Sequence, residues 1–255
     1  MRGEKMARSL SWRYFLICLM IIFATEPVDS QKPQIPVAPD TGESIIKYVL
    51  ARAKENELQK KELLTYQRVF TINNLDDNEE EIDTEREEVV LIDFGGKEKV
   101  IEAKLHGKPV KKNKTTSPRF NLMNILDAMI KLDNFNVVRI EKIEDRHFYV
   151  ISFNPKSKMK PNGDTEDVII RSEGEIYVDI EKFYIKKLSA RLIRDYERAL
   201  GLFSLSRANI EMELDEFKGI VVMKSIILVD KYWIIFKGST FEKQKFTYKD
   251  YRKKI

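Results

Sequence analysis

Residues that commonly perform catalysis or bind metals are few in this sequence. It has two histidines, His106 and His147, and a single cysteine, Cys18. The histidines lie far apart and show neither the H-x-x-x-H nor the H-E-x-x-H spacing of zinc sites. A lone histidine needs partner groups to do chemistry, so both are interpreted as structural.

Other catalytic motifs are also missing: the sequence has no G-x-S-x-G elbow, P-loop or G-x-G-x-x-G fingerprint. Carboxylates are plentiful, but no spacing singles out a glycosidase-like pair. Residues 76–88 hold nine acidic side chains without the D-x-D-x-D-G spacing of a calcium loop, which predicts a solvated hairpin loop. We therefore expect no catalytic residue, metal site or cofactor, and a hydrolase with an unlocated site is the weakest alternative.

The charge balance argues against nucleic acid as a partner. The 45 basic and 41 acidic residues give a net charge of +4, which is typical of a mixed, solvated surface. Residues 233–255 are rich in aromatic and basic side chains, as in single-strand binders. Alternation of Phe241, Phe246, Tyr248 and Tyr251 is explained more simply by a strand whose lysines protect an edge.

The N-terminus has the pattern of an export signal. A basic start, with Arg2, Lys5, Arg8 and Arg13, precedes a short apolar run at residues 14–24. We predict a signal peptide at residues 1–30, with a membrane anchor as the alternative, and a proline-rich linker at 31–39. Cys18 follows Ile17 inside the apolar run, unlike a lipoprotein cysteine, and its removal would leave a cysteine-free exported protein.

Two helices are predicted in the remaining chain. Asp40 is expected to cap the first, with Glu43 completing a capping box and apolar side chains following at three- and four-residue spacing. The second is expected from Pro118 to Leu132, after Ser117 as cap. Its polar stripe is narrow, so it is either permanent core or a lid over something apolar. The residues expected to border such a cavity are Leu122, Met123, Leu126, Met129 and Ile130.

Most other segments predict strands. The clearest is a hairpin at residues 171–192, whose two arms alternate apolar and polar side chains, and Gly95-Gly96 marks another turn. Residues 154–167 are predicted to form a turn-rich loop and 194–202 a short helical turn. The further strands are expected at residues 63–73, 89–94, 98–105, 135–143, 146–153, 208–217, 220–230, 232–237 and 239–251. Some ten to twelve strands with two helices indicate one mainly β domain at residues 40–255, a large antiparallel sheet curling over its helices.

Several of these segments resemble one bacterial family. They are LLTYQRVF (63–70), HFYVISFNPK (147–156), GEIYVDIEKFYIKKLSARL (174–192) and KFTYKDYRKK (245–254). In this order, after a signal and an amphipathic helix, they resemble the LolA-like proteins that sort lipoproteins to the outer membrane. The resemblance covers roughly residues 40–251, and its most specific piece is Gly174 to Asp179.

This resemblance implies an unclosed β-barrel whose helices fill the concave side as a lid over an apolar cavity. It also implies a monomeric periplasmic protein that binds lipid or lipoprotein acyl chains, without enzymatic activity. The alternative is an envelope sensor or interaction module that uses the same half-barrel to bind a protein partner. The sequence departs from the best-known carriers in its acidic insert at 76–88 and its longer linker, and no lid-latching arginine can be matched.

Overall fold

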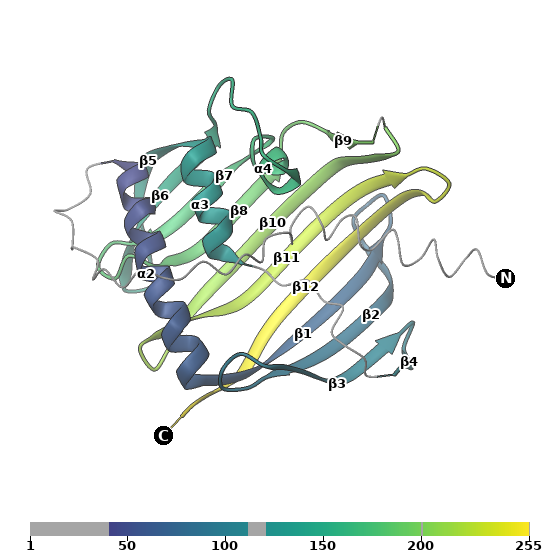
Figure 1. Cartoon of the computed structure of the whole chain (residues 1–255), viewed down its shortest axis with the longest axis horizontal. Coiled ribbons are helices and arrows are strands. Elements are labelled where there is room, and N and C mark those ends of the chain that lie inside the picture. Colours follow the sequence, from purple (N-terminus) through teal and green to yellow (C-terminus); the bar gives the residue numbers. More distant parts are fainter. Residues whose placement is uncertain (1–40, 112–120, 200, 255) are drawn as a thin grey trace.

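The described residues, 41–111, 121–199 and 201–254 of a computed structural model, form one antiparallel sheet of 12 strands (Figure 1). The strand order is β4-β3-β2-β1-β12-β11-β10-β8-β7-β6-β5, with β9 paired to β10. The end strands, β4 and β5, do not pair with each other, so the barrel is open and the predicted fold class is confirmed. The bounds are β1 Leu64–Leu75, β2 Glu81–Ile92, β3 Glu98–Leu105, β4 Lys108–Pro109, β5 Asp133–Ile143, β6 Arg146–Pro155, β7 Ser172–Asp179, β8 Ile185–Leu192, β9 Tyr196–Arg198, β10 Phe203–Phe217, β11 Ile220–Ile234 and β12 Gly238–Lys253.

Three helices of the described chain lie on the concave face of the sheet: α2 (Gly42–Leu63), α3 (Leu122–Leu132) and α4 (Asp164–Ile169) (Figure 1). They cover the half of the sheet that contains β5 to β10, and α2 crosses diagonally towards β1 and β11. None of these helices combines the length and apolar content that a membrane crossing requires.

The main core lies between these helices and the sheet. Helix α2 contributes Ile45, Ile46, Val49 and Leu50, which share one helix face at three- and four-residue spacing. Alternate side chains of the strands face them, because the side-chain period of a strand is two. These facing residues include Phe70, Ile72, Ile151, Phe153, Ile176, Val178, Ile185, Leu188, Met212, Leu214, Ile226 and Phe246.

Helix α2 begins one residue later than the sequence predicted. Thr41 is the N-cap, and its Oγ1 accepts a hydrogen bond from the amide of Ser44. The Oγ of Ser44 in turn accepts a hydrogen bond from the amide of Thr41. Glu43 instead forms an ion pair with Lys47 at 2.6 Å. The prediction of a capping box formed by Asp40 and Glu43 is therefore wrong. Thr41 and Ser44, each one residue further along the chain, form the box.

The acidic segment 76–88 is also different from the prediction. Only residues 76–80 form the loop, and β2 begins at Glu81. Basic side chains of distant strands neutralise this hairpin: Lys231 lies 3.1 Å from Asp77, Arg207 2.7 Å from Glu79, and Lys243 2.9 Å from Glu81. These ion pairs lower the repulsion between the acidic side chains of the hairpin. The sequence pattern alone does not reveal them, because their basic partners lie on distant strands.

Three smaller expectations need correction. Residues 194–202 contain strand β9 and not a helical turn, because Tyr196 is buried and pairs with Leu205. The loop expected at 154–167 contains the start of α4, and the strands predicted at 220–230 and 232–237 are the single strand β11. Strands β5 and β6 and the hairpin of β7 and β8 are confirmed. Helix α3 begins at Leu122 with Asn121 as its N-cap, four residues later than the predicted start at Pro118. The signal, the linker, Asp40, Ser117 and Pro118 lie outside the described residues.

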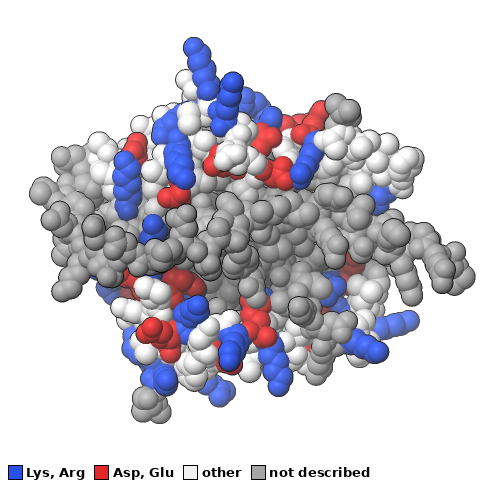
Figure 2. All heavy atoms as spheres, viewed as in Figure 1, with Lys and Arg blue, Asp and Glu red and all other residues white. Residues whose placement is uncertain are grey.

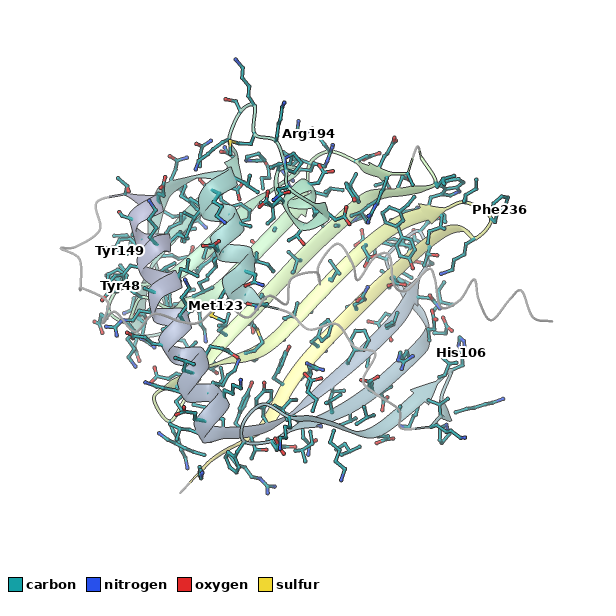
Figure 3. All side chains as sticks on the ribbon, in the orientation of Figure 1. Tyr48, His106, Met123, Tyr149, Arg194 and Phe236 are labelled. Atoms are coloured by element: carbon teal, nitrogen blue, oxygen red, sulfur yellow. The ribbon has the colours of Figure 1, made fainter. Side chains whose placement is uncertain are left out.

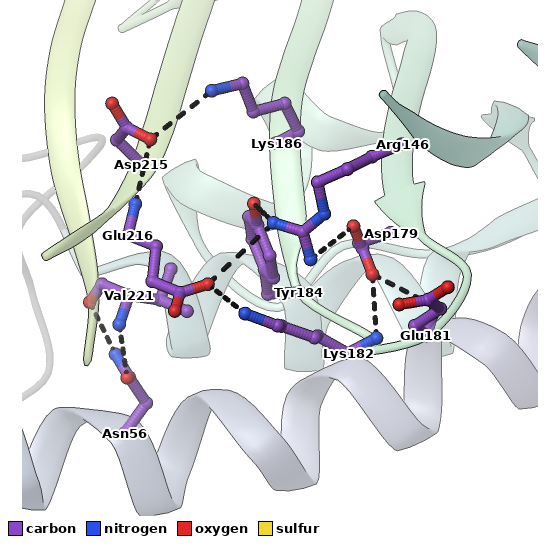
Figure 4. A network of polar contacts seen from close by, with 10 residues as sticks. All are labelled: Asn56, Arg146, Asp179, Glu181, Lys182, Tyr184, Lys186, Asp215, Glu216 and Val221. Atoms are coloured by element: carbon purple, nitrogen blue, oxygen red, sulfur yellow. Dashed lines mark hydrogen bonds and ion pairs between the residues drawn. The ribbon is translucent and has the colours of Figure 1, made fainter. Parts of the chain in front are cut away.

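Charged side chains fasten one end of the sheet (Figure 4). Arg146 at the start of β6 lies 2.7 Å from Asp179 at the end of β7 and donates a hydrogen bond of 2.9 Å to the Tyr184 hydroxyl. Asp179 accepts bonds from the amides of Glu181 and Lys182, which shapes the β7–β8 turn. Over the visible face as a whole, basic and acidic groups are interspersed, as a net charge of +4 suggests (Figure 2).

Candidate functional site

A large cleft lies between α2, α3 and the concave face of the sheet. Its volume is about 1590 Å³, above the roughly 300–1,000 Å³ that is usual for small-molecule pockets. Its walls come from α2, α3 and α4 and from strands that include β1, β2, β3, β8, β10, β11 and β12. A site of this size and position accepts an extended ligand along the sheet.

One wall of the cleft is mainly apolar. Alternate side chains of β10 and β11 face inward, since the period of a strand is two, and one face of α3 lies opposite them. Figure 3 shows Met123 on this side of α3, near its N-terminal end. The apolar residues of this wall include Val49, Leu122, Met123, Ile125, Phe183, Ile185, Leu214, Val221 and Met223.

The opposite part of the floor carries polar groups. Tyr66 of β1 and Tyr248 of β12 have ring centroids 6.1 Å apart. Burial raises the pKa of each to about 12, so both phenols are neutral hydrogen-bonding groups near pH 7. Beside them the guanidinium of Arg68 lies 3.4 Å from the carboxylate of Glu98, and both side chains are largely buried. Arg68 lies opposite Tyr248 in the pairing of β1 with β12.

Helix α2 is held across the open side of the sheet by a specific contact. The Asn56 amide donates to the Val221 carbonyl at 2.7 Å and accepts from the Val221 amide at 2.8 Å (Figure 4). The buried side chains of the helix end at Leu50, and near its C-terminus the Lys61 carbonyl accepts a hydrogen bond from the Gly95 amide at 2.8 Å. This pair of hydrogen bonds fixes α2 as a wall of the cleft.

The five residues predicted to border a cavity divide into two groups. Leu122 and Met123 line the cleft. Leu126 and Met129, only 0% and 3% exposed, belong to the main core, and the half-buried Ile130 packs against it. One face of α3 thus borders the cleft along the helix, including Ala128 and Lys131 of its later turns, while Leu126 and Met129 face the core. Whether the helix is a lid or permanent core stays a prediction.

Both ends of α3 are fastened. The Asn121 side chain accepts a hydrogen bond from the amide of Asn124 at the N-terminus. At the C-terminus the ammonium of Lys156, from the end of β6, donates to the carbonyls of Ile130 at 3.0 Å and Lys131 at 3.2 Å. These bonds satisfy carbonyls that a helix end leaves without partners.

Sequence reasoning missed the polar floor. Tyr66 and Arg68 lie in a segment predicted as a strand, and Tyr248 in another, but the alternation gives no sign of which face is concave. Among the described residues no group of three or more His, Cys, Asp or Glu side chains is arranged to hold a metal ion. His106 and His147 are both exposed, the first in the β3–β4 turn and the second near the start of β6.

Comparison with known proteins finds solved structures of low sequence identity and low TM-score. No family model matches the sequence, and no curated protein does. Among solved structures, a LolA superfamily protein from Nitrosomonas europaea is 14% identical with a TM-score of 0.34, and the match covers 85% of this chain and 95% of that one. A putative outer membrane lipoprotein-sorting protein domain from Vibrio parahaemolyticus is 10% identical with a TM-score of 0.34, over 82% and 93%. The MucA/MucB complex of Pseudomonas aeruginosa matches at 8% identity and a TM-score of 0.25, over 82% and 99%.

Two of these solved structures are named for LolA or for lipoprotein sorting, the family that the sequence resembles. At these TM-scores the likeness says nothing about a ligand. What the cleft binds must follow from the residues that line it.

Proposed function

We propose that this protein is an exported, periplasmic, non-enzymatic carrier that binds lipid or lipoprotein acyl chains in the cleft between α2, α3 and the sheet. The observation that carries the proposal is the amphipathic lining, with an apolar wall facing a floor of tyrosines and a buried ion pair. An acylated molecule has the same two chemistries, a hydrocarbon chain and a polar head.

The energetics of such binding are favourable. Each buried methylene contributes about 0.8 kcal/mol, so a dozen ordered carbons outweigh the cost of immobilising the ligand. Met123 and Met223 face the cleft, and methionine adapts to varied shapes because its side chain is unbranched. The lining therefore suits chains of differing length.

Leu122 and Met123 are proposed as the residues of α3 that contact the acyl chain. Leu126, Met129 and Ile130 anchor the helix to the core and support the wall from behind. The export signal at residues 1–30 would bring the protein to the compartment where lipoproteins travel.

The test compares two substitutions at Met123. Met123→Asp introduces a carboxylate into the apolar wall and should weaken binding of a fluorescent fatty acid at least tenfold. Met123→Leu preserves volume and polarity and should bind nearly as well as the wild type. Because Met123 is only half-buried, the melting temperature should change little in either variant, whereas Leu126→Asp should unfold the protein.

Lipid extracted from the purified protein and identified by mass spectrometry gives an independent measure. Equal probe affinity in folded Met123→Asp and wild type would remove α3 from the site. No probe binding and no co-purified lipid would contradict the carrier proposal and favour the interaction alternative.

A further inference from the structure

The turn between β11 and β12 carries a side chain that the fold does not explain. Phe236 is 101% exposed, and Figure 3 shows it at the extreme end of the molecule, beyond the last residues of both strands. Its backbone adopts a φ of +64°, the left-handed region that glycine, asparagine and aspartate tolerate best. Both the turn and the exposure therefore disfavour phenylalanine at this position.

A second phenylalanine shows what an ordinary explanation looks like. Phe183, in the β7–β8 turn, has a φ of +52°, but its ring meets Tyr48 at 4.6 Å and packs against the main core. Packing thus compensates for the backbone cost there. Phe236 has no such compensation, since its whole side chain faces solvent.

Other apolar residues lie near Phe236 in the same turn and in the neighbouring one. The amide of Ile235 donates a hydrogen bond of 3.0 Å to the carbonyl of Leu202, which brings the β9–β10 turn alongside the β11–β12 turn. Leu202 is 46% exposed and Trp233 is 40% exposed. We name the group Leu202, Trp233, Ile235 and Phe236 the apolar apex.

Two of the cations beside the apex are paired with carboxylates, and a third lies over an aromatic ring. Lys231 is paired with Asp77 at 3.1 Å and Arg207 with Glu79 at 2.7 Å. The ammonium of Lys237 lies over the Tyr232 ring, 5.8 Å from its centroid. A surface that attaches to the apex is thus selected by its apolar character more than by its charge.

We infer that the apolar apex inserts into the interfacial region of a lipid bilayer. Trp, Phe and Lys are the side chains favoured at that depth, where an apolar body and a polar tip are both accommodated. A stable protein interface needs about 800 Å² from each partner. One phenylalanine supplies about 200 Å² and the other three side chains are only partly exposed, so the apex is too small for such an interface.

This inference is independent of the cleft. None of the four apex residues lines the cleft, and the apex lies at the opposite end of β11 from Val221 and Met223. A carrier would use such an apex to meet a membrane while its cleft holds the ligand. Loss of vesicle binding and loss of acyl-probe binding should therefore occur in different variants.

The test uses the fluorescence of Trp233 in the full chain. The sequence has two tryptophans, Trp12 and Trp233, so a Trp12→Phe background leaves the apex tryptophan alone. Phosphatidylcholine vesicles with brominated acyl chains should quench its emission, and this readout reports the apex itself and not the apolar N-terminal segment. Adding anionic lipid or salt should change the quenching by less than about twofold, because Lys231 and Arg207 are paired with carboxylates and Lys237 adds only a single charge.

Phe236→Asn should lower the vesicle affinity measured in this way about tenfold, the change expected when half of an aromatic side chain's burial is lost. Its melting temperature should stay the same or rise, because asparagine suits the turn. Phe236→Leu should retain most of the binding. The matched control is Phe94→Asn, which removes a 41% exposed phenylalanine from the β2–β3 turn and should bind as the wild type does.

Unquenched Trp233 with vesicles of either composition would overturn the inference and leave the apex to a protein partner. Equal quenching of wild type and Phe236→Asn would also overturn it. Binding that requires anionic lipid and disappears in salt would contradict apolar insertion.

Discussion

Gly174 is the residue whose side-chain size the fold limits most severely. A Cβ at this position of β7 would lie 1.9 Å from the Ser189 carbonyl oxygen and 2.8 Å from the Phe153 ring. The neighbouring strands β6 and β8 can therefore approach β7 this closely only because residue 174 has no side chain. Gly174 is also the first residue of the segment with the most specific family resemblance. Its missing side chain allows β6, β7 and β8 to pack closely at this point.

Gly174→Ala should destabilise the protein by about 3 kcal/mol, because backbone and ring must both move to admit one methyl group. The measurement is urea unfolding followed by circular dichroism. Ser189→Ala keeps the crowded carbonyl and should cost less than about 1 kcal/mol. A Gly174→Ala variant as stable as the control would mean that β7 and β8 can separate at little cost.

At the scale of the element, α3 is fastened at its C-terminus by one lysine. The Lys156 ammonium serves the carbonyls of Ile130 and Lys131, and the Lys156 amide donates to the Leu132 carbonyl at 2.8 Å. Side-chain and backbone bonds together join the helix end to the end of β6. Motion of the cleft wall would have to begin by breaking them.

Lys156→Met retains the aliphatic stem but loses both side-chain bonds, and should cost about 1–2 kcal/mol. Hydrogen exchange should become faster for the amides of the last turn of α3, while the central strands keep their protection. Lys160→Met, at an exposed position of the following loop, is the control and should change neither. Unchanged exchange in α3 would show that core packing alone holds the helix.

Strand β5 shows how an edge of the open sheet is protected. Val137, Val138 and Ile140 are exposed along it, which by itself favours pairing with another chain. A bulge lies between Val137 and Arg139, and Arg139 pairs with Glu175 at 2.8 Å and Glu141 at 3.2 Å. The irregular, charged edge is a poor template for further strands.

Across the whole molecule, three buried carboxyls link stability to pH. Burial raises the pKa of Asp133 to about 7 and that of Glu242 to about 7, and it raises the pKa of Asp230 well above its ordinary value. Asp230 and Glu242 face each other across β11 and β12, and each disfavours ionisation of the other. Tyr232 and Gln244 donate hydrogen bonds to Glu242. The charge of Glu85 also raises the pKa of Glu242, and the charge of Lys237 lowers it. The charge of Lys156 lowers the pKa of Asp133 but does not cancel the effect of burial.

Because these pKa values are higher in the folded protein, the folded state binds more protons than the unfolded chain between about pH 4 and 7. The free energy of unfolding should therefore fall as the pH rises through that window, and the protein should be less stable at pH 8 than at pH 5. For Glu242 the loss is on the order of 2–3 kcal/mol.

Glu242→Gln should flatten this dependence and raise stability at pH 8, as measured by urea unfolding at several pH values. Glu197→Gln, at an exposed position of β9, should keep the wild-type profile. Stability that rises from pH 5 to pH 8 in the wild type would contradict the direction of the shifts.

What the sequence determined by itself was local and periodic. Alternation predicted β5, β6, β10 and the hairpin of β7 and β8, because side chains on successive strand residues face opposite sides regardless of the partner strand. The composition of residues 118–132 likewise indicated a helix that is buried on most sides. With the family resemblance, these patterns were enough to predict an open antiparallel sheet over helices.

The tertiary structure alone decided the cleft and its chemistry. Tyr66, Glu98 and Tyr248 meet only because β3, β2, β1 and β12 are neighbours in the sheet, although β1 and β12 lie at opposite ends of the described chain. The division of α3 into a face that borders the cleft and a face that packs in the core depends in the same way on what lies opposite. Strand pairing between distant segments sets which face becomes concave, and periodicity along the chain contains no information about that choice.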